Sequence, residues 1–83
     1  MDKQEIARQV REYIGREMPK SDVELTDTTN LLEEWFVDSM QVVQIVMFIE
    51  SPFGVDVYRA DINGQNFRNI ETISQLVAGR LAG

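Results

Sequence analysis

The first apolar stripe of the chain has the spacing of a helix. Between Lys3 and Met18 the intervals are four, three, one and four residues, at Ile6, Val10, Tyr13, Ile14 and Met18. This spacing places the five side chains on one helical face, with most of the charged residues between them elsewhere. Because the residue before a proline is pushed out of helical geometry, we expect the helix to end at Met18, before Pro19.

The central apolar run, from Val42 to Ile49, is ambiguous by composition because its many β-branched residues would also suit a buried strand. Asp38 is a good N-cap, and Gln41 three residues later completes a variant of the capping box. We therefore expect a helix that begins at Asp38 or Ser39. Pro52 should end it early, and Gly54 should take a positive φ in a short extended link over residues 53–57.

The rest of the chain predicts one more full helix, one short helical turn and a long loop. Asn69 should cap a last helix whose apolar stripe is Ile70, Ile73, Leu76, Val77 and Leu81. One short helical turn is expected within residues 60–67. The loop from Pro19 to Val37 is unusually long for a compact domain, and we expect it to dock through Val23, Leu25, Leu31 and Leu32.

The composition narrows the possible functions. The 83 residues make a single domain, 1–83, and contain neither cysteine nor histidine. Disulfides and thiolate metal sites are therefore impossible, and the usual general base is missing, so an enzyme is not expected. The chain has no apolar stretch long enough to span a membrane and no signal-peptide pattern at its start, which predicts a cytoplasmic protein.

The negative charge is concentrated in the middle of the chain. The formal net charge is −6, and the window from Ser21 to Tyr58 contains eight acidic residues and no Lys or Arg. Such a segment repels nucleic acid, whose binding requires neutralised phosphates, and favours partners with basic surfaces. Solubility alone would also explain an acidic run, but Ser39 lies inside this window, and we interpret the window as a docking surface.

The tripeptide Asp38-Ser39-Met40 places a serine hydroxyl at the expected helix start, where unpaired N–H groups and the helix dipole favour a phosphate. Together with the preceding Leu-Leu-Glu-Glu, the following Phe-Gly-Val-Asp-Val and the segment 66–70 before the last helix, this motif resembles the acyl and peptidyl carrier proteins over nearly the whole chain. The resemblance implies an all-α, four-helix bundle with a long first loop and a short third helix, in a free-standing carrier.

The same resemblance implies a cofactor and partners. In that family the motif serine carries a covalent 4'-phosphopantetheine arm, and this role falls on Ser39. A phosphopantetheinyl transferase would attach the arm, with Asp38 as helix cap and transferase contact. A ligase or transferase would load an acyl or aminoacyl group, and synthase or tailoring enzymes would use it. No nucleic acid or membrane partner is implied, and the carrier is expected to be a monomer.

The resemblance also divides the surface of the second helix. Val42, Ile45, Val46, Ile49 and Phe53 are expected to face inward. The surface that partner enzymes contact is expected to comprise Met40, Val43, Met47, Glu33, Glu34, Glu50 and Trp35. Methionine suits a surface that must fit several partners. A core position for Met40, Val43 and Met47 would be the simpler interpretation without the Ser39 motif.

Three departures from the family pattern stand out. Trp35 occupies a position that is commonly glycine, where its ring either packs over the helix start or lines the path of the arm; we favour packing. Gln41 and Gln44 replace acids of fatty acid carriers, which favours a polyketide, nonribosomal peptide or related specialised pathway. Pro52 shortens the second helix, which puts in doubt any transfer of family contacts at its far end.

Two other functions are compatible with parts of the sequence. In a helical interaction domain with an acidic docking face, Ser39 would be only a cap. A serine hydrolase is disfavoured because the chain lacks histidine and a Gly-x-Ser-x-Gly elbow.

The acidic middle of the chain predicts a salt-dependent stability. Eight acids without an internal base should repel one another near neutral pH, so added NaCl or a divalent cation should raise the melting temperature. Thermal unfolding at increasing salt measures this effect. A melting temperature that does not change with salt would contradict it.

Overall fold

A computed structural model describes residues 2–18 and 21–82 of the chain, and in these ranges it is all-α. The helices are α1 (Lys3–Glu17), α2 (Ser39–Phe53) and α3 (Ile70–Ala82), with a single 3₁₀ turn, η1 (Arg59–Asp61), between α2 and α3. The prediction of an all-α fold is confirmed. The predicted four-helix count is not, because the described residues form three α-helices and, in place of the short third helix, one 3₁₀ turn.

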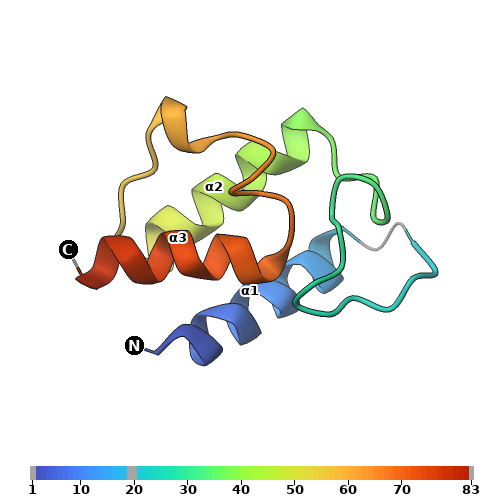
Figure 1. Cartoon of the computed structure of the whole chain (residues 1–83), viewed down its shortest axis with the longest axis horizontal. Coiled ribbons are helices and arrows are strands. Elements are labelled where there is room, and N and C mark those ends of the chain that lie inside the picture. Colours follow the sequence, from blue (N-terminus) through green and yellow to red (C-terminus); the bar gives the residue numbers. More distant parts are fainter. Residues whose placement is uncertain (1, 19–20, 83) are drawn as a thin grey trace.

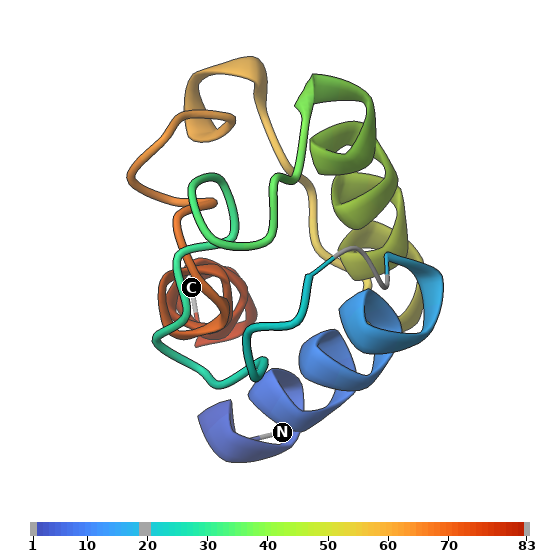
Figure 2. The same ribbon diagram turned by 90° about the vertical axis from the view of Figure 1, so that its right-hand side faces the viewer.

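The helices enclose one apolar core. In Figure 1, α1 runs in one direction and α2 and α3 return in the other, so that α3 packs along α1 and the described ends of the chain lie on the same side. Figure 2 shows α3 nearly end-on, with the segment before α3 above it and the long loop passing along one side of it. The fully buried core side chains come from all three helices and from both connections: Ile6, Val10, Ile14, Leu31, Ile45, Ile49, Phe67, Ile70, Ile73 and Val77.

Helix α1 agrees with its predicted stripe. The Asp2 carboxylate accepts a hydrogen bond from the Glu5 N–H at 2.8 Å and caps the helix. Ile6, Val10, Ile14 and Met18 are buried, whereas Tyr13 is half-buried and stacks on Phe48 of α2 with ring centroids 4.2 Å apart. The helix ends at Glu17 and Met18 caps it, one residue earlier than predicted. Pro19 and Lys20, where the predicted loop begins, lie outside the described residues.

The first loop is held in place by buried side chains and by hydrogen bonds of its backbone. Leu31 is buried and Leu25 packs against the core, as predicted, but Val23 and Leu32 are exposed, so their predicted docking role is wrong. The N–H of Leu31 donates to the carbonyl of Arg68 at 2.7 Å. The Val23 carbonyl accepts a hydrogen bond from the indole N–H of Trp35 at 2.9 Å. The loop is thus held at Val23 by a polar contact that an apolar pattern does not reveal.

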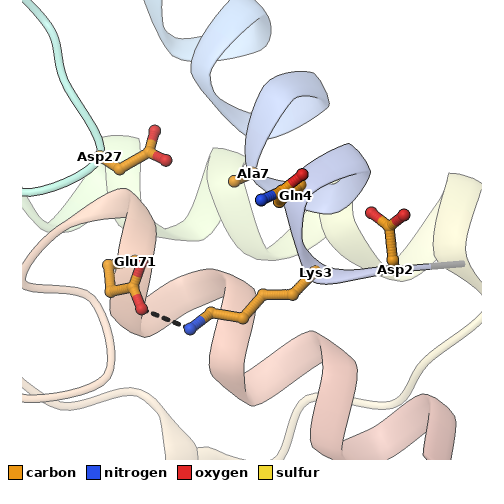
Figure 3. A pocket seen from close by; sticks show the side chains of 6 residues that line it. All are labelled: Asp2, Lys3, Gln4, Ala7, Asp27 and Glu71. Atoms are coloured by element: carbon orange, nitrogen blue, oxygen red, sulfur yellow. Dashed lines mark hydrogen bonds and ion pairs between the residues drawn. The ribbon is translucent and has the colours of Figure 1, made fainter.

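A polar pocket marks the place where the loop meets α1 and α3. Figure 3 shows Asp2, Lys3, Gln4 and Ala7 of the α1 start around it, with Asp27 of the loop and Glu71 of α3. Lys3 and Glu71 form an ion pair across it. Arg11, which does not line the pocket, pairs with Asp27 at 2.6 Å, and the Asp27 carbonyl accepts from the Glu71 N–H at 2.8 Å. These contacts fasten the loop to both helices on a side of the molecule that does not include Ser39.

The second half of the fold corrects three predictions. Helix α2 passes through Pro52 and ends at Phe53, which is buried and helical and so does not begin the predicted extended link. Burial of Phe53 compensates for the hydrogen bond that Pro52 cannot donate. Gly54 ends the helix with φ 67°, as predicted, and its N–H donates to the Glu50 carbonyl. The third correction concerns Leu81, which is exposed near the end of α3, beyond the core contacts made by Ile70, Ile73 and Val77.

The prediction for the start of α3 is confirmed. The Asn69 side chain accepts a hydrogen bond from the Thr72 N–H at 2.8 Å, and the Thr72 hydroxyl accepts from the Asn69 N–H at 3.2 Å. The paired caps fix the first turn of α3 against the end of the preceding segment. The Thr72 hydroxyl also bonds the Asn66 carbonyl at 2.9 Å, which holds that segment to the helix.

Two interhelical ion pairs predict how stability depends on pH. The hydrogen bond from Lys3 lowers the pKa of Glu71 below its ordinary 4.5, and Arg80 likewise lowers the pKa of Asp61 below 3.8. Because these pKa values are lower in the folded state, the pairs contribute stability above pH about 5 and lose it as the pH falls toward 3. Urea unfolding measures this effect. Between pH 6 and pH 3 the free energy of unfolding should fall less in Glu71→Gln than in the wild type.

The control is Glu33→Gln, which removes an exposed carboxylate that forms no ion pair within residues 2–18 and 21–82. It should keep the wild-type pH dependence. Equal slopes for Glu71→Gln and the wild type would contradict a stabilising Lys3–Glu71 pair.

Candidate functional site

Ser39 is the first residue of α2, and the residues on both sides of it fix this position. The Asp38 carboxylate accepts a hydrogen bond from the Gln41 N–H at 2.9 Å, and the Gln41 side chain accepts from the Asp38 N–H at 3.1 Å. The predicted capping box is therefore confirmed. Gln41 is buried while Asp38 and Ser39 are exposed. The serine hydroxyl is thus presented to solvent by a helix start whose backbone is held on both sides.

An apolar groove lies beside Ser39. Its volume is about 330 Å³, and Ser39 is one of the residues that line it. One side is formed by α2 and Leu32, and the other by residues 62–64, which follow η1, with Phe67 only 2% exposed at the base; the complete lining is Leu32, Ser39, Val42, Val43, Ile62, Asn63, Gly64 and Phe67. The site therefore combines an exposed hydroxyl with an apolar surface, two features that sequence spacing alone did not bring together.

The outer face of α2 is apolar and exposed, as predicted. Met40 is 72% exposed and Met47 65%, with Val43 between them on the same face. Their spacing of three and four residues continues the line that begins at Ser39. The inward set, Val42, Ile45, Val46, Ile49 and Phe53, is buried. The division of α2 into a core face and an exposed face is therefore confirmed, whereas contact with partners stays a prediction.

Phe36, three residues before Ser39, is another exposed apolar residue, and it was not identified from the sequence. Its side chain is 66% exposed and its φ is 54°, the only positive φ of a non-glycine residue in the described ranges. The N–H of the following residue, Val37, donates a hydrogen bond to the Leu31 carbonyl at 2.9 Å. This bond closes a backbone turn in which the Phe36 side chain points outward. Burial periodicity could not identify Phe36, because the signal is a backbone turn and not a repeat of apolar positions.

Trp35 and Glu50 do not occupy the positions expected of partner-contacting residues. Trp35 is only 6% exposed and belongs to the core, so its placement on the partner surface is wrong and the packing interpretation is correct. Its hydrogen bond to the Val23 carbonyl explains why a large ring with a polar edge fits there. Glu50 is half-buried and accepts a hydrogen bond from the Val57 N–H at 3.0 Å, which ties the end of α2 to the following segment.

The acids before Ser39 lie on the surface. Glu33 and Glu34 are both exposed, and the Glu34 carboxylate accepts a hydrogen bond from the Asn30 N–H at 2.9 Å. Asn30 in turn accepts from the N–H groups of Leu32 and Glu33. The turn is therefore ordered by its own side chains, and its exposed acids precede Phe36 and Asp38 closely in the sequence.

The side chains of the site offer a hydroxyl group for chemistry. Within residues 2–18 and 21–82, no three His, Cys, Asp or Glu side chains are grouped so that they could hold a metal ion. Also within these ranges, no helix has the length and apolar character needed to cross a bilayer. What the site does offer is an exposed primary hydroxyl beside an apolar groove, which suits a modification that is attached through oxygen.

The capping box predicts a measurable stability. Asp38→Ala removes the oxygen that accepts from the Gln41 N–H, so the free energy of unfolding should fall by about 1 kcal/mol. Asp38→Asn keeps an accepting oxygen and should stay within a few tenths of a kcal/mol of the wild type. Urea unfolding at neutral pH measures both. An equal loss in the two variants would show that charge, and not the cap, carries the effect.

Comparisons with known proteins place this geometry in a family. Residues 8–78 match the family described as "Phosphopantetheine attachment site". The chain is also 29% identical over 76 residues to the acyl carrier protein of Thermotoga maritima, covering 92% of this chain and 88% of that protein. The match spans the loop, the capped serine and all three helices. The chain belongs to the phosphopantetheine-carrying carrier protein family, whose members are non-catalytic and hold a covalent 4'-phosphopantetheine.

Proposed function

We propose that this protein is an acyl carrier whose 4'-phosphopantetheine is attached to Ser39. The observation that carries the proposal is the position of the Ser39 hydroxyl, exposed on the first residue of α2 and bordering an apolar groove. Each of the other three serines has a different setting. Ser51 lies near the far end of α2, Ser74 is buried and bonds the Ile70 carbonyl, and the Ser21 hydroxyl accepts from the Val23 N–H.

The helix start favours a phosphodiester on Ser39. The Gln41 N–H is already bonded to Asp38, whereas the N–H groups of Ser39 and Met40 have no carbonyl one turn earlier in the helix. These groups and the helix dipole stabilise a phosphate there. The Asp38 carboxylate is unfavourable beside a phosphate, so we assign it to the cap and to contact with the transferase, not to holding the arm.

The chain itself supplies no activation of the serine. It has no histidine, and the neighbouring Asp38 carboxylate is engaged in the cap. A phosphopantetheinyl transferase must therefore supply the base that takes the Ser39 proton. When bound, 4'-phosphopantetheine provides a terminal thiol that holds an acyl or aminoacyl group as a thioester. The contribution of this protein is to present that group at high effective concentration to successive enzymes.

The groove beside Ser39 is the surface on which we place the carried group. Val42, Val43, Ile62 and Phe67 make its lining largely apolar. An acyl chain that lies on these side chains removes apolar surface from water on both partners. Asn63 offers polar groups at the same border, although its side chain already bonds the Ala60 carbonyl and the N–H groups of Gln65 and Asn66.

The partner enzymes are proposed to dock on the exposed face of α2 and the turn before it. Met40, Val43 and Met47 would form the apolar part of the contact, and the exposed Phe36, three residues before Ser39, would add to it. The nearby acids Glu33 and Glu34, together with the absence of Lys and Arg from residues 21–58, favour partners with basic rims. These partners are the transferase, an acyl- or aminoacyl-loading enzyme, and synthase or tailoring enzymes.

The pathway is proposed to be a specialised one, such as polyketide or nonribosomal peptide synthesis. Of the two glutamines that suggested it, Gln41 is buried in the capping box and cannot report on docking. Exposed Gln44 alone supports this choice. We further propose that the carrier acts as a single domain over 1–83, as a monomer and in the cytoplasm.

The test of the attachment site is the mass of the intact protein before and after incubation with coenzyme A, Mg²⁺ and a promiscuous phosphopantetheinyl transferase. The wild type should gain one phosphopantetheine, and Ser39→Ala should gain none. Ser51→Ala is the matched control, because it removes an exposed serine hydroxyl from the same helix. It should be modified like the wild type.

Two outcomes would overturn the proposal. Modification of Ser39→Ala would move the attachment to another residue. No modification of the folded wild type by several transferases would favour a helical interaction domain, in which the exposed face of α2 binds a basic partner and Ser39 only begins the helix.

A further inference from the structure

The residues that line the groove beside Ser39 come mainly from two different parts of the chain. The first side of the groove is α2 itself. The second side, residues 62–64, belongs to the segment between η1 and α3, which we call the wall segment and define as residues 59–66. Among the described residues, no hydrogen bond joins the wall segment to α2. The width of the groove therefore depends on what holds the wall segment elsewhere.

The wall segment is attached to α3 at both of its ends. Figure 1 shows it above α3: the link after α2 rises beside the end of α3 to reach it, and the chain descends from it to the start of that helix. At the start of α3, the Thr72 hydroxyl bonds the Asn66 carbonyl at 2.9 Å and Phe67 is buried. At the other end the attachment is made by Arg80, in the last turn of α3.

Arg80 makes three contacts with this part of the chain. One guanidinium nitrogen donates to the Asp56 carbonyl at 2.8 Å, and another to the Asp61 carboxylate at 2.6 Å. The guanidinium carbon lies 5.0 Å from the centroid of the Tyr58 ring, within the range of a cation–π contact. The Asp61 side chain is only 14% exposed, so this ion pair is less screened than a typical surface pair.

Asp61 connects Arg80 to the rest of the wall segment. Its other carboxylate oxygen accepts from the Tyr58 N–H at 2.8 Å, and its carbonyl accepts from the Asn66 side chain at 2.9 Å. The next residue, Ile62, is part of the groove lining. A displacement of Asp61 must therefore shift the 3₁₀ turn and Ile62 together.

We propose that Arg80 is a positioning residue that fixes the wall of the Ser39 groove from the opposite end of α3. Without its two hydrogen bonds, the wall segment keeps its anchor at Phe67 and Thr72 but loses the one at η1. The wall then moves away from α2 more often, and a group that lies in the groove becomes more accessible to solvent. Sheltering of a carried group rests on the proposed function of Ser39, whereas the position of the wall does not.

The first experiment measures how often the wall segment opens in the protein without phosphopantetheine. Amide hydrogen exchange, followed by NMR, reports on the N–H groups of Asp61, Ile62 and Asn63, each of which bonds a carbonyl within the turn. In Arg80→Gln these amides should exchange about tenfold faster, the effect expected when charge-assisted hydrogen bonds are lost. Core amides of α1 and α2 should keep their wild-type rates.

Two further variants separate positioning from general stability. Arg16→Gln is the matched control, because Arg16 also has an ion pair and an aromatic ring nearby but both partners, Glu17 and Tyr13, lie on α1. It should leave the wall amides unchanged. Arg80→Lys keeps the charge but cannot bond two acceptors through a planar fork, so its exchange rates should fall between those of the wild type and Arg80→Gln.

The second experiment measures access to the groove. The protein is loaded with an octanoyl or an acetyl group from the corresponding acyl-coenzyme A by a promiscuous transferase, and cleavage by hydroxylamine is timed. Arg80→Gln should speed the cleavage of the octanoyl form several-fold and leave the acetyl form unchanged, since the shorter group gains little from an apolar groove.

Each contrary result has a distinct meaning. Unchanged wall amides in Arg80→Gln, or an equal increase at all amides, would overturn the positioning role of Arg80. Faster wall exchange with unchanged octanoyl cleavage would overturn the claim that the wall controls access. Failure of the transferase to modify the wild type would overturn the function proposed for Ser39, and the exchange data would still decide the role of Arg80.

Discussion

The site depends on where α2 begins. The mutual hydrogen bonds of Asp38 and Gln41 set that point, and they leave Ser39 as the first helical residue. Successive residues of a helix differ in direction by about 100°. A start displaced by one residue would therefore turn the exposed face of α2 away from the surface and bring Met40 or Val43 toward the core. The short polar contact thus determines both which hydroxyl is offered and which apolar side chains surround it.

The remaining structure holds this helix start without covering it. On one side lies the long loop. Its Leu31 N–H donates a hydrogen bond to the Arg68 carbonyl, and its Trp35 side chain is buried in the core. On the other side, the wall segment is carried by α3 and not by α2. The groove lies where these two supports approach α2. A carrier must release its cargo to enzymes as well as hold it, and a groove whose two sides are attached to different helices allows both.

The features that follow from local sequence were predicted well. The apolar stripes of α1 and α3, the caps at Asp38 and Asn69, the left-handed Gly54 and the two faces of α2 all depend on residues within a few positions of one another. The motif at Ser39 required the family resemblance, because a cap of aspartate followed by serine is common in helices of any function. The comparison with known proteins then established the family.

The wrong predictions involve contacts between residues that are distant in sequence, or backbone turns that no periodic apolar pattern reveals. Trp35 was placed at the surface because its hydrogen bond to Val23 cannot be read from spacing, and Glu50 because its partner is the Val57 N–H seven residues later. Phe36 was overlooked because a positive φ, not an apolar repeat, exposes it. Pro52 was read as a stop, although burial of Phe53 carries the helix one residue further. The contacts of Arg80 likewise join residues about twenty positions apart.

The most direct measurement locates the phosphopantetheine by tandem mass spectrometry. Because no Lys or Arg lies between residues 21 and 58, trypsin releases one peptide, 21–59, that contains Ser21, Ser39 and Ser51. Fragmentation of this peptide from transferase-treated protein assigns the added group to one of them. The account predicts that all of the modification is on Ser39. Modification of Ser21 or Ser51, or its absence from this peptide, would contradict the account.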